Sequence, residues 1–496
     1  MSASFTIDLA TAGIDQLEQA QRAGEVTSVT LTDGYLARID ALSVHGPHLN
    51  AVRCLDPTAR AQAAARDAER ASGAVCGPLH GIPVLVKDNI DVAHLPTSAG
   101  SVALAHSVPV ADAPLVAALR RAGVVILGKA NLTELANYTT EGMPSGYSSL
   151  GGQVLNPYDA SCTPSGSSSG SAVAAAAGLA AAAVGTETSG SILSPAQACS
   201  VVGVKPTVGL VSRTGVVPIS STQDTPGPMT RSVRDAAWLL AAMMGGGSTG
   251  DDAHHLVGGG DPEDPATANC PLTAADLTAE LSGDALRGAR LGVIADTSEI
   301  FAAALEVLRR RGVTLVEVAL PEVTAESVLS YEFARDFRTY CARLPAGCPV
   351  RTLADVVAYN DAHARDALKF GQTLLLESAR VDLDDPDTLA RYTTAREWGL
   401  DQARAAIDSA LTVNRLDAVV SASAATRVGA RAGYPSVSVP AGYTTHGREP
   451  VSVVFLGTAW SEPRLLALAH DYEQASLMWR SPAEVNPSLF RSSMDG

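Results

Sequence analysis

The sequence predicts an α/β fold, in which residues 1–496 form a single compact domain with a central mixed β-sheet flanked by helices. Two observations lead to this prediction. Short apolar runs typical of buried strands alternate with helical patterns, and such alternation indicates a mixed or largely parallel sheet. The best linker candidate, a Gly/Asp/Pro-rich stretch at 245–265, has strand patterns on both sides. We therefore expect a surface excursion there and not a domain boundary.

The first half of the chain begins with an N-terminal helical segment at about 7–71. Apolar residues at helical spacing predict two short helices between 7 and 42, and an Ala-rich helix occupies 59–71. A buried strand that ends on a lysine is predicted at 81–87, a helix at 113–122 and a strand at 124–127. A Gly/Ser-rich stretch follows at 145–171, then an Ala-rich helix, and then a second Gly/Ser turn at 185–191.

The second half continues the alternation of strands and helices. It predicts a strand, a helix and a strand at 290–295, 301–311 and 314–318. A long helix is expected at 354–376, followed by three short strands and a last helix at 418–421, 436–439, 452–455 and 463–472.

Composition excludes several classes of protein. Lys and Arg number 36 against 52 Asp and Glu, and a chain with a net charge of −16 repels phosphate backbones and anionic lipid. We therefore expect no nucleic-acid partner and no membrane. The seven scattered cysteines, odd in number and without C-x-x-C, argue against a disulfide framework or a zinc site. The N-terminal residues lack the basic segment of a signal peptide, which predicts a cytoplasmic protein.

Three segments carry residues suited to catalysis. Lys87 ends an apolar strand, and a desolvated lysine can act as a base near neutral pH, although taken alone a solvated strand-end lysine is the commoner case. The serines of 165–171 precede an Ala-rich helix, and serine hydroxyls can cap the free N–H groups at the start of a helix. The alternative is that this segment is a flexible linker. In 185–192, small residues permit a tight turn whose amides could converge on one point and bind an oxyanion. The alternative is that this segment is an ordinary Gly/Ser loop.

Together these segments resemble the amidase signature family. Residues 81–89 match its G-I-P-x-x-x-K-D-N motif, and 165–171 match G-G-S-S-G-G-S with Ser at two positions where Gly is commoner. Residues 185–192 match G-T-[DE]-x-G-G-S-I, with Ser at 189. Further similarity at 203–207 and 224–231 extends the resemblance over nearly the whole chain.

The resemblance implies a mechanism without histidine. Ser191 would be the nucleophile, Ser167, held in this family by a cis peptide bond, the relay, and neutral Lys87 the base. The amides of Thr188, Ser189, Gly190 and Ser191 would form the oxyanion hole. No metal or other cofactor is expected, because neither an H-E-x-x-H motif nor a clustered Cys/His set occurs.

Within the family, the likeness is greatest to bacterial peptide amidases, which release ammonia from C-terminal carboxamides. Many members have an Arg two or three positions after the nucleophile, and some of them use it to bind a substrate carboxylate, whereas this sequence has Leu193 and Ser194 there. Neutral amides fit better, because an acid group would be left unpaired. The loop at 421–433 is shorter than usual, which leaves the substrate range open. The implied partner is a peptide or small-molecule amide, and the chain would be a monomer or a homodimer.

Other interpretations stay open. Residues 166–170 also match the G-x-S-x-G elbow of α/β-hydrolases with Ser168 as nucleophile, which requires a preceding strand and a later histidine. The family resemblance further allows an amidase of small or aryl amides, an acyl-transferring enzyme that forms amides, or the glutaminase subunit of an amidotransferase complex.

Overall fold

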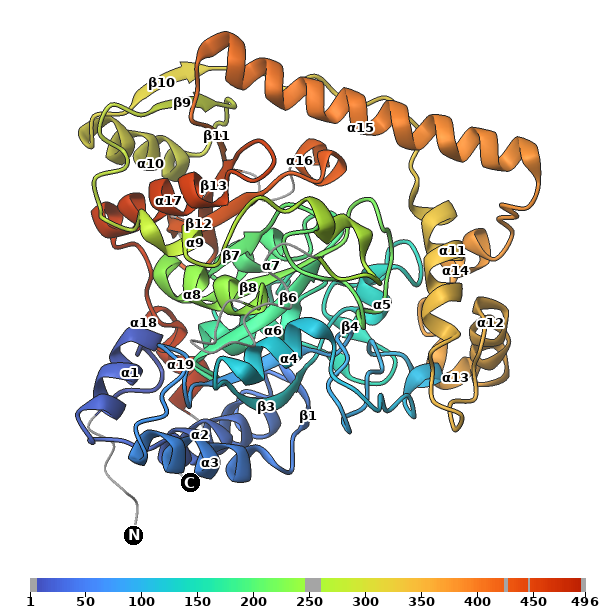
Figure 1. The fold of residues 1–496 in the computed structure, drawn as a ribbon, viewed down its shortest axis with the longest axis horizontal. Coiled ribbons are helices and arrows are strands. Elements are labelled where there is room, and N and C mark those ends of the chain that lie inside the picture. Colours follow the sequence, from blue (N-terminus) through green and yellow to red (C-terminus); the bar gives the residue numbers. More distant parts are fainter. Residues whose placement is uncertain (1–6, 246–259, 423–426, 445–446, 492–496) are drawn as a thin grey trace.

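A mixed eleven-stranded sheet runs through the protein, and helices flank it (Figure 1). The computed structural model describes residues 7–245, 260–422, 427–444 and 447–491. In spatial order the strands are β1 (Val52–Leu55), β3 (Val125–Ala130), β2 (Pro83–Lys87), β6 (Ala182–Glu187), β8 (Thr225–Thr230), β7 (Val202–Lys205), β12 (Ser436–Tyr443), β13 (Pro450–Leu456), β11 (Ala418–Ser421), β9 (Arg290–Val293) and β10 (Thr314–Glu317). The predicted α/β fold with a central mixed sheet is confirmed.

The directions of the strands bring the carboxyl ends of β2 and β6 together. The neighbours β3, β2 and β6 are parallel, as are β11, β9 and β10, whereas the other pairs are antiparallel. Val86 of β2 pairs with Val184 of β6, so Lys87 lies beside the last residues of β6, where both strands have their carboxyl ends. The carboxyl ends of adjacent parallel strands are where α/β proteins commonly bind ligands.

The helices form three groups along the chain. The N-terminal helices are α1 (Ile14–Arg22), α2 (Ser28–Arg38) with a π-helical turn at Ile39–Val44, α3 (Ala59–Ala71) and α4 (Pro114–Arg121). The central ones are α5 (Glu134–Asn137), α6 (Ser169–Ala176), α7 (Leu193–Ala198), α8 (Val233–Met243) and α9 (Asp276–Ala279). The C-terminal ones are α10 (Glu299–Arg310), α11 (Leu329–Cys341), α12 (Leu353–Ala362), α13 (Ala364–Ala367), α14 (Thr373–Ser378), α15 (Pro386–Asn414), α16 (Arg427–Ala432), α17 (Glu462–Ser476), α18 (Pro482–Val485) and α19 (Pro487–Arg491). A two-stranded hairpin, β4 (Tyr147–Ser148) with β5 (Gly152–Gln153), lies outside the main sheet.

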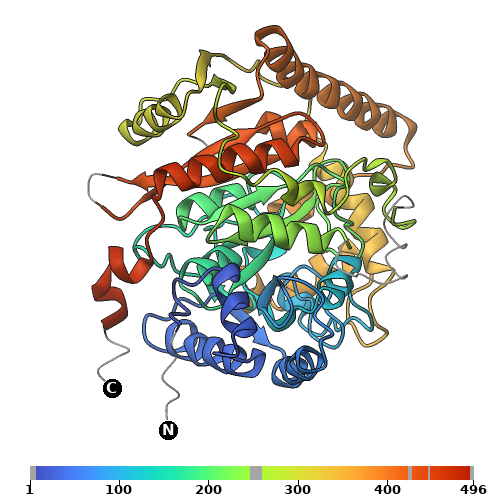
Figure 2. The same ribbon diagram turned by 60° about the vertical axis from the view of Figure 1, so that its left-hand side comes forward.

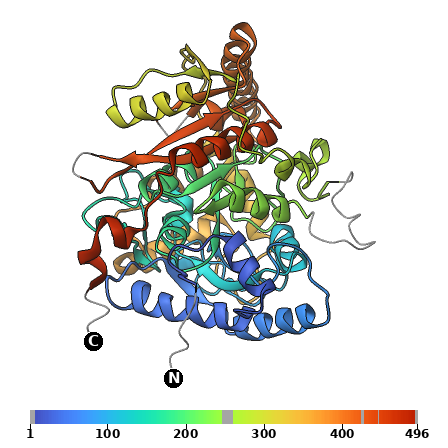
Figure 3. The same cartoon turned by 90° about the vertical axis from the view of Figure 1, so that its left-hand side faces the viewer.

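Packing follows from the apolar faces of these elements. The fully buried, Ala-rich helix α6 packs against β6, β8 and β2, and α7 packs against β7 and β12. The 29-residue helix α15 lies along the edge of the molecule opposite the N-terminal helices (Figures 2 and 3). Among the described helices, none is long and apolar enough to cross a membrane.

Several predicted elements need correction. The long helix expected at 354–376 is wrong, because the chain breaks between α12, α13 and α14, with Gly371 at φ +89°. The turn expected from 185 begins only after β6 ends at residue 187. Strand β8 was not predicted from the sequence, since Pro226 and Pro228 argue against an inner strand. β7 pairs with β8 only beyond both prolines.

Two further expectations concern segments that the structure describes only in part. Of the surface excursion at 245–265, residues 246–259 lie outside the described residues. Of the loop expected at 421–433, residues 423–426 also lie outside them, and residues 427–432 form α16 instead of a loop.

Candidate active site

Lys87 is enclosed at the end of β2. Its side chain is fully buried, and its Nζ lies 2.8 Å from Ser167 Oγ, 2.9 Å from Ser168 Oγ and 2.9 Å from Thr186 Oγ1. Burial lowers the pKa of Lys87 to about 7, although the Asp224 and Glu187 carboxylates act in the opposite direction. The interpretation of Lys87 as a solvated strand-end lysine is therefore wrong, and the amine can be neutral close to neutral pH.

The serine-rich segment packs closely against neighbouring chain segments before α6. The Gly166–Ser167 peptide bond is cis, and the Ser167 carbonyl accepts from the Thr133 amide at 3.0 Å. At Gly170 a Cβ would come within 2.4 Å of the Asn131 carbonyl oxygen, so only glycine permits this close approach. The segment is thus not a flexible linker.

The hydroxyl groups of this segment do not cap α6 as predicted. Ser168, the N-cap residue, makes no side-chain cap. Its hydroxyl instead donates to the Thr186 carbonyl at 3.0 Å and accepts from the Thr186 amide at 3.2 Å. Ser168 therefore fastens α6 to β6.

Ser191 lies in a turn between β6 and α7 (188–191), which we call the oxyanion turn after the role expected of its amides. Gly190 adopts φ +84°, a left-handed conformation that glycine favours. Glu187 Oε2 accepts from the amides of Ile192 at 2.7 Å and Leu193 at 2.9 Å. In the described part of the chain no acceptor binds the four amides of the oxyanion turn. These amides are free to bind a ligand oxygen, and the Ser191 side chain is adjacent to them.

Three chain segments far apart in sequence meet here. The Ser168 amide donates to the Ser191 carbonyl at 3.1 Å, which holds the oxyanion turn against the start of α6. Among the hydrogen bonds of the described residues, none joins the hydroxyls of Ser167 and Ser191. Catalytic hydrogen bonds are often long before substrate binds and tighten afterwards.

Several residues at this centre had no role assigned from the sequence. Thr186 Oγ1 contacts Lys87 and accepts from the Asn89 side-chain amide at 3.0 Å. Asp224 Oδ1 accepts from the Thr188 hydroxyl at 2.6 Å, and burial raises the pKa of Asp224 to about 6. Thr186, Asn89 and Asp224 all lie within the motifs quoted above, and their place in those motifs is the sequence feature that could have indicated a role.

The α/β-hydrolase interpretation of Ser168 is wrong. Its hydroxyl is fully buried and bonded to Lys87 and Thr186, so it cannot reach a substrate. Residues 158–164 form no strand, whereas the elbow motif requires one immediately before the nucleophile.

A possible metal-binding group lies elsewhere. Glu69, Cys76 and His80 have ligand atoms within 4.8 Å of one another, the one such group found in the described ranges. His80 Nδ1 accepts from the Cys76 amide at 3.4 Å, so Nε2 donates to the Arg66 carbonyl at 2.9 Å. Because both ring nitrogens are occupied, this group does not fit a metal site.

Comparisons with known proteins point to one family. The model of a family described as Amidase matches residues 30–426. A probable amidase of Arabidopsis thaliana is 38% identical, with 97% of this chain and 93% of that protein covered. A glutamyl-tRNA(Gln) amidotransferase subunit of Deinococcus radiodurans is 34% identical, with 92% and 95% covered. The solved structure of a peptide amidase from Stenotrophomonas maltophilia is 44% identical, with a TM-score of 0.88 over 95% of this chain and 98% of that one.

Proposed function

The chain belongs to the amidase family, whose members act on carbon–nitrogen amide bonds, and we propose that it releases ammonia from neutral carboxamides, above all C-terminal peptide amides. The observation that carries this proposal is the contact between buried Lys87 and Ser167 at 2.8 Å, beside Ser191 and the four free amides of the oxyanion turn. A base, a relay, a nucleophile and an oxyanion site are the parts that acyl transfer requires.

In the proposed reaction, Ser191 Oγ attacks the amide carbonyl. The Ser191 proton passes to Ser167 Oγ as the Ser167 proton passes to neutral Lys87 Nζ. The new oxyanion lies against the amides of the oxyanion turn. As the carbon–nitrogen bond breaks, the proton returns from Lys87 through Ser167 to the nitrogen, and ammonia leaves. Water then attacks the acyl-enzyme by the same proton route and releases the acid.

The mechanism predicts an acid limb in the pH dependence of kcat/KM. Lys87 must be neutral, so activity should rise with pH through about 7 and fall as the amine is protonated below that value. The limb should be measured with an uncharged substrate. Replacing the buried His470 with Asn should leave its midpoint in place; loss of the limb in that variant would contradict a lysine base.

The surroundings of the nucleophile support a neutral substrate. Leu193 is buried against Val454 of β13, and Ser194 is half-buried at the start of α7. Neither carries a positive charge that could neutralise a carboxylate next to the scissile bond, and an unpaired buried acid is costly. The similarity to a peptide amidase favours longer acyl parts. Their remote binding raises kcat only if it aligns the carbonyl with the oxyanion turn.

A panel of amides tests this substrate class by ammonia release at matched concentrations. We expect kcat/KM to rise from an amino-acid amide to a dipeptide and then a tripeptide amide. It should be lowest for malonamic acid, whose carboxylate lies beside the amide. Ser194→Arg should raise kcat/KM for malonamic acid about tenfold relative to the tripeptide amide, the size of effect typical of a charged contact. Ser194→Met supplies the matched control without charge and should not.

Two outcomes would refute the peptide-amide proposal. One is best turnover of small acidic amides with peptide amides ignored. The other is ammonia release that appears only when a separate partner protein is added, which is the behaviour of an amidotransferase glutaminase.

A further inference from the structure

Thr188, the first residue of the oxyanion turn, is held by a neighbouring loop. Asp224 Oδ1 accepts from the Thr188 hydroxyl at 2.6 Å, and the Gln223 side-chain amide donates to the Thr188 carbonyl at 3.1 Å. The second oxygen of Asp224 accepts from the amides of Ile219 at 2.7 Å and Ser220 at 2.9 Å. Residues 219–224, which we call the clamp segment, therefore grip Thr188 at both its side chain and its backbone.

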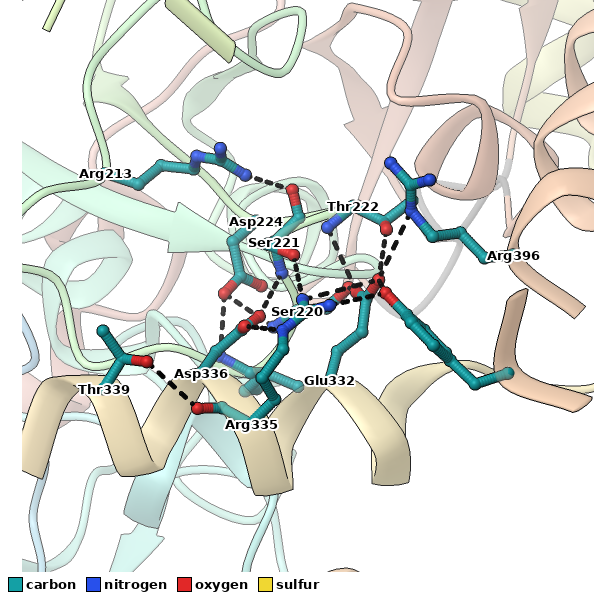
Figure 4. A network of polar contacts seen from close by, with 12 residues as sticks. Arg213, Ser220, Ser221, Thr222, Asp224, Glu332, Arg335, Asp336, Thr339 and Arg396 are labelled. Carbon is teal, nitrogen blue, oxygen red and sulfur yellow. Dashed lines mark hydrogen bonds and ion pairs between the residues drawn. The ribbon is translucent and has the colours of Figure 1, made fainter. Parts of the chain in front are cut away.

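Helix α11 holds the clamp segment from the other side (Figure 4). Glu332 is fully buried, and one of its oxygens accepts from the Ser220 hydroxyl and from the Thr222 amide at 3.1 Å. Its other oxygen accepts from the Thr222 hydroxyl and from the Tyr392 hydroxyl of α15 at 2.9 Å. A single carboxylate thus joins the clamp segment to two helices.

The next turn of α11 adds contacts to Ser221. Asp336 Oδ2 accepts from the Ser221 amide at 2.8 Å, and Arg335 Nη2 donates to the Ser221 hydroxyl at 2.6 Å. Glu332, Arg335 and Asp336 share one face of the helix because their spacing is three and four residues. The amides or hydroxyls of Ser220, Ser221 and Thr222 are consequently all bound by α11.

The chemistry of Glu332 makes it hard to replace. All four of its neutral partners donate hydrogen bonds, and a carboxylate offers only acceptors. Glutamine at this position would remove the charge and turn one acceptor into a donor, which a hydroxyl group could satisfy only by accepting a hydrogen bond instead of donating one. The guanidinium groups of Arg335 and Arg396, at 4.0 and 3.9 Å, balance the buried charge.

Thr188 is buried, and both its hydroxyl and its carbonyl are bound by the clamp segment. A cavity of about 10 Å³, no larger than one water molecule, adjoins these residues, and its lining includes Thr188, Asp224, Asn89 and Thr186. We therefore expect the position of the Thr188 amide to depend on the hydrogen bonds of the clamp segment.

We propose that Asp224 and Glu332 are positioning residues, which fix the Thr188 amide for the oxyanion through the clamp segment; this rests on the proposed function. Neither residue touches the substrate. Their effect is expected on kcat, because an oxyanion hole stabilises the transition state more than the bound amide.

The test compares Thr188→Val, which removes the hydroxyl with little change of volume, with Thr188→Ser, which keeps it, and with Glu332→Gln. Thr188→Val and Glu332→Gln should each lower kcat on a tripeptide amide about tenfold, less than deleting a donor outright, with KM within about twofold. Inhibition by a peptide aldehyde, whose adduct with Ser191 places a tetrahedral oxygen in the turn, should weaken by the same factor. Thr188→Ser keeps the hydroxyl, so its losses in both measurements should be clearly smaller than those of Thr188→Val.

Glu326→Gln is the matched control, since this exposed glutamate precedes α11 and contacts Tyr331 and Arg391 instead of the clamp segment. It should leave kcat and aldehyde inhibition unchanged. If Thr188→Val and Glu332→Gln both keep wild-type kcat and inhibition while Ser191→Ala is inactive, the clamp is refuted and the proposed function stands. If Ser191→Ala itself stays active, the proposed function fails and the clamp with it.

Discussion

Ser191→Ala is expected to lower kcat on a tripeptide amide by about 10⁴- to 10⁶-fold while leaving the fold intact. The variant loses the only atom that would form the acyl-enzyme, and the oxyanion turn alone preserves a small residual rate. The residue is small and only 7% exposed, and among the described residues its hydroxyl makes no hydrogen bond, so its replacement removes none that supports the turn. The thermal midpoint should therefore stay close to that of the wild type.

The neighbouring Ser189 provides a matched control, because it lies in the same turn and its side chain is exposed. Only its backbone amide is proposed to contribute, so Ser189→Ala should keep near-normal activity. A sulfonyl fluoride should add one sulfonyl group to Ser191 and none in Ser191→Ala, as peptide mass spectrometry would show. Normal turnover by well-folded Ser191→Ala, or labelling at another serine, would overturn the assignment of the nucleophile.

Local patterns in the sequence located β2, β3 and the five strands from β9 to β13, but not β1, β6, β7 or β8, and they missed several helices, among them α8, α11 and the 29-residue α15. The Ala-rich helix at 59–71 coincides with α3, and the apolar run before Lys87 is β2, because burial on both faces leaves a clear signature. The expected helix at 354–376 failed where Gly371 takes a left-handed conformation. The inner strand β8 was missed because it contains two prolines, which usually exclude an inner strand. They are tolerated here because the neighbouring strand β7 pairs with β8 only beyond them.

The candidate residues of the site came from the sequence, but their contacts did not. The resemblance to the amidase signature family singled out Lys87, Ser167 and Ser191, yet it could not show which side chains surround them or that β2 and β6 are neighbours. That adjacency brings the Thr186 hydroxyl to Lys87, and the loop before β8 brings Asp224 to Thr188. The partners of Glu332 in the clamp segment lie more than a hundred residues away in sequence, and no local pattern encodes such a meeting.

Replacing Lys87 with methionine is expected to have the second large effect, a loss of about 10³-fold or more in kcat, because proton transfer from Ser167 would have no acceptor. Methionine has a similar length and needs no hydrogen-bond partner. The double variant Lys87→Met/Ser191→Ala should be little worse than Ser191→Ala alone, since groups that act on one proton route are not additive. A double variant slower by the product of the two single effects would contradict a shared route.

The same substitution should reveal the cost of keeping this lysine buried. The pKa of Lys87 is about 7 in the folded protein and 10.5 is its ordinary value, so between these values the unfolded chain binds a proton that the folded chain does not. The stability of the wild type therefore falls as the pH decreases through this window, whereas methionine carries no proton. The Tm of Lys87→Met relative to the wild type should rise from about pH 10 to about pH 7 and level off below.

Lys369→Met, at an exposed lysine, is the control and should show a constant difference in Tm. A pH-independent difference for Lys87→Met as well would mean that Lys87 stays charged in the folded protein, and it could then not serve as the base.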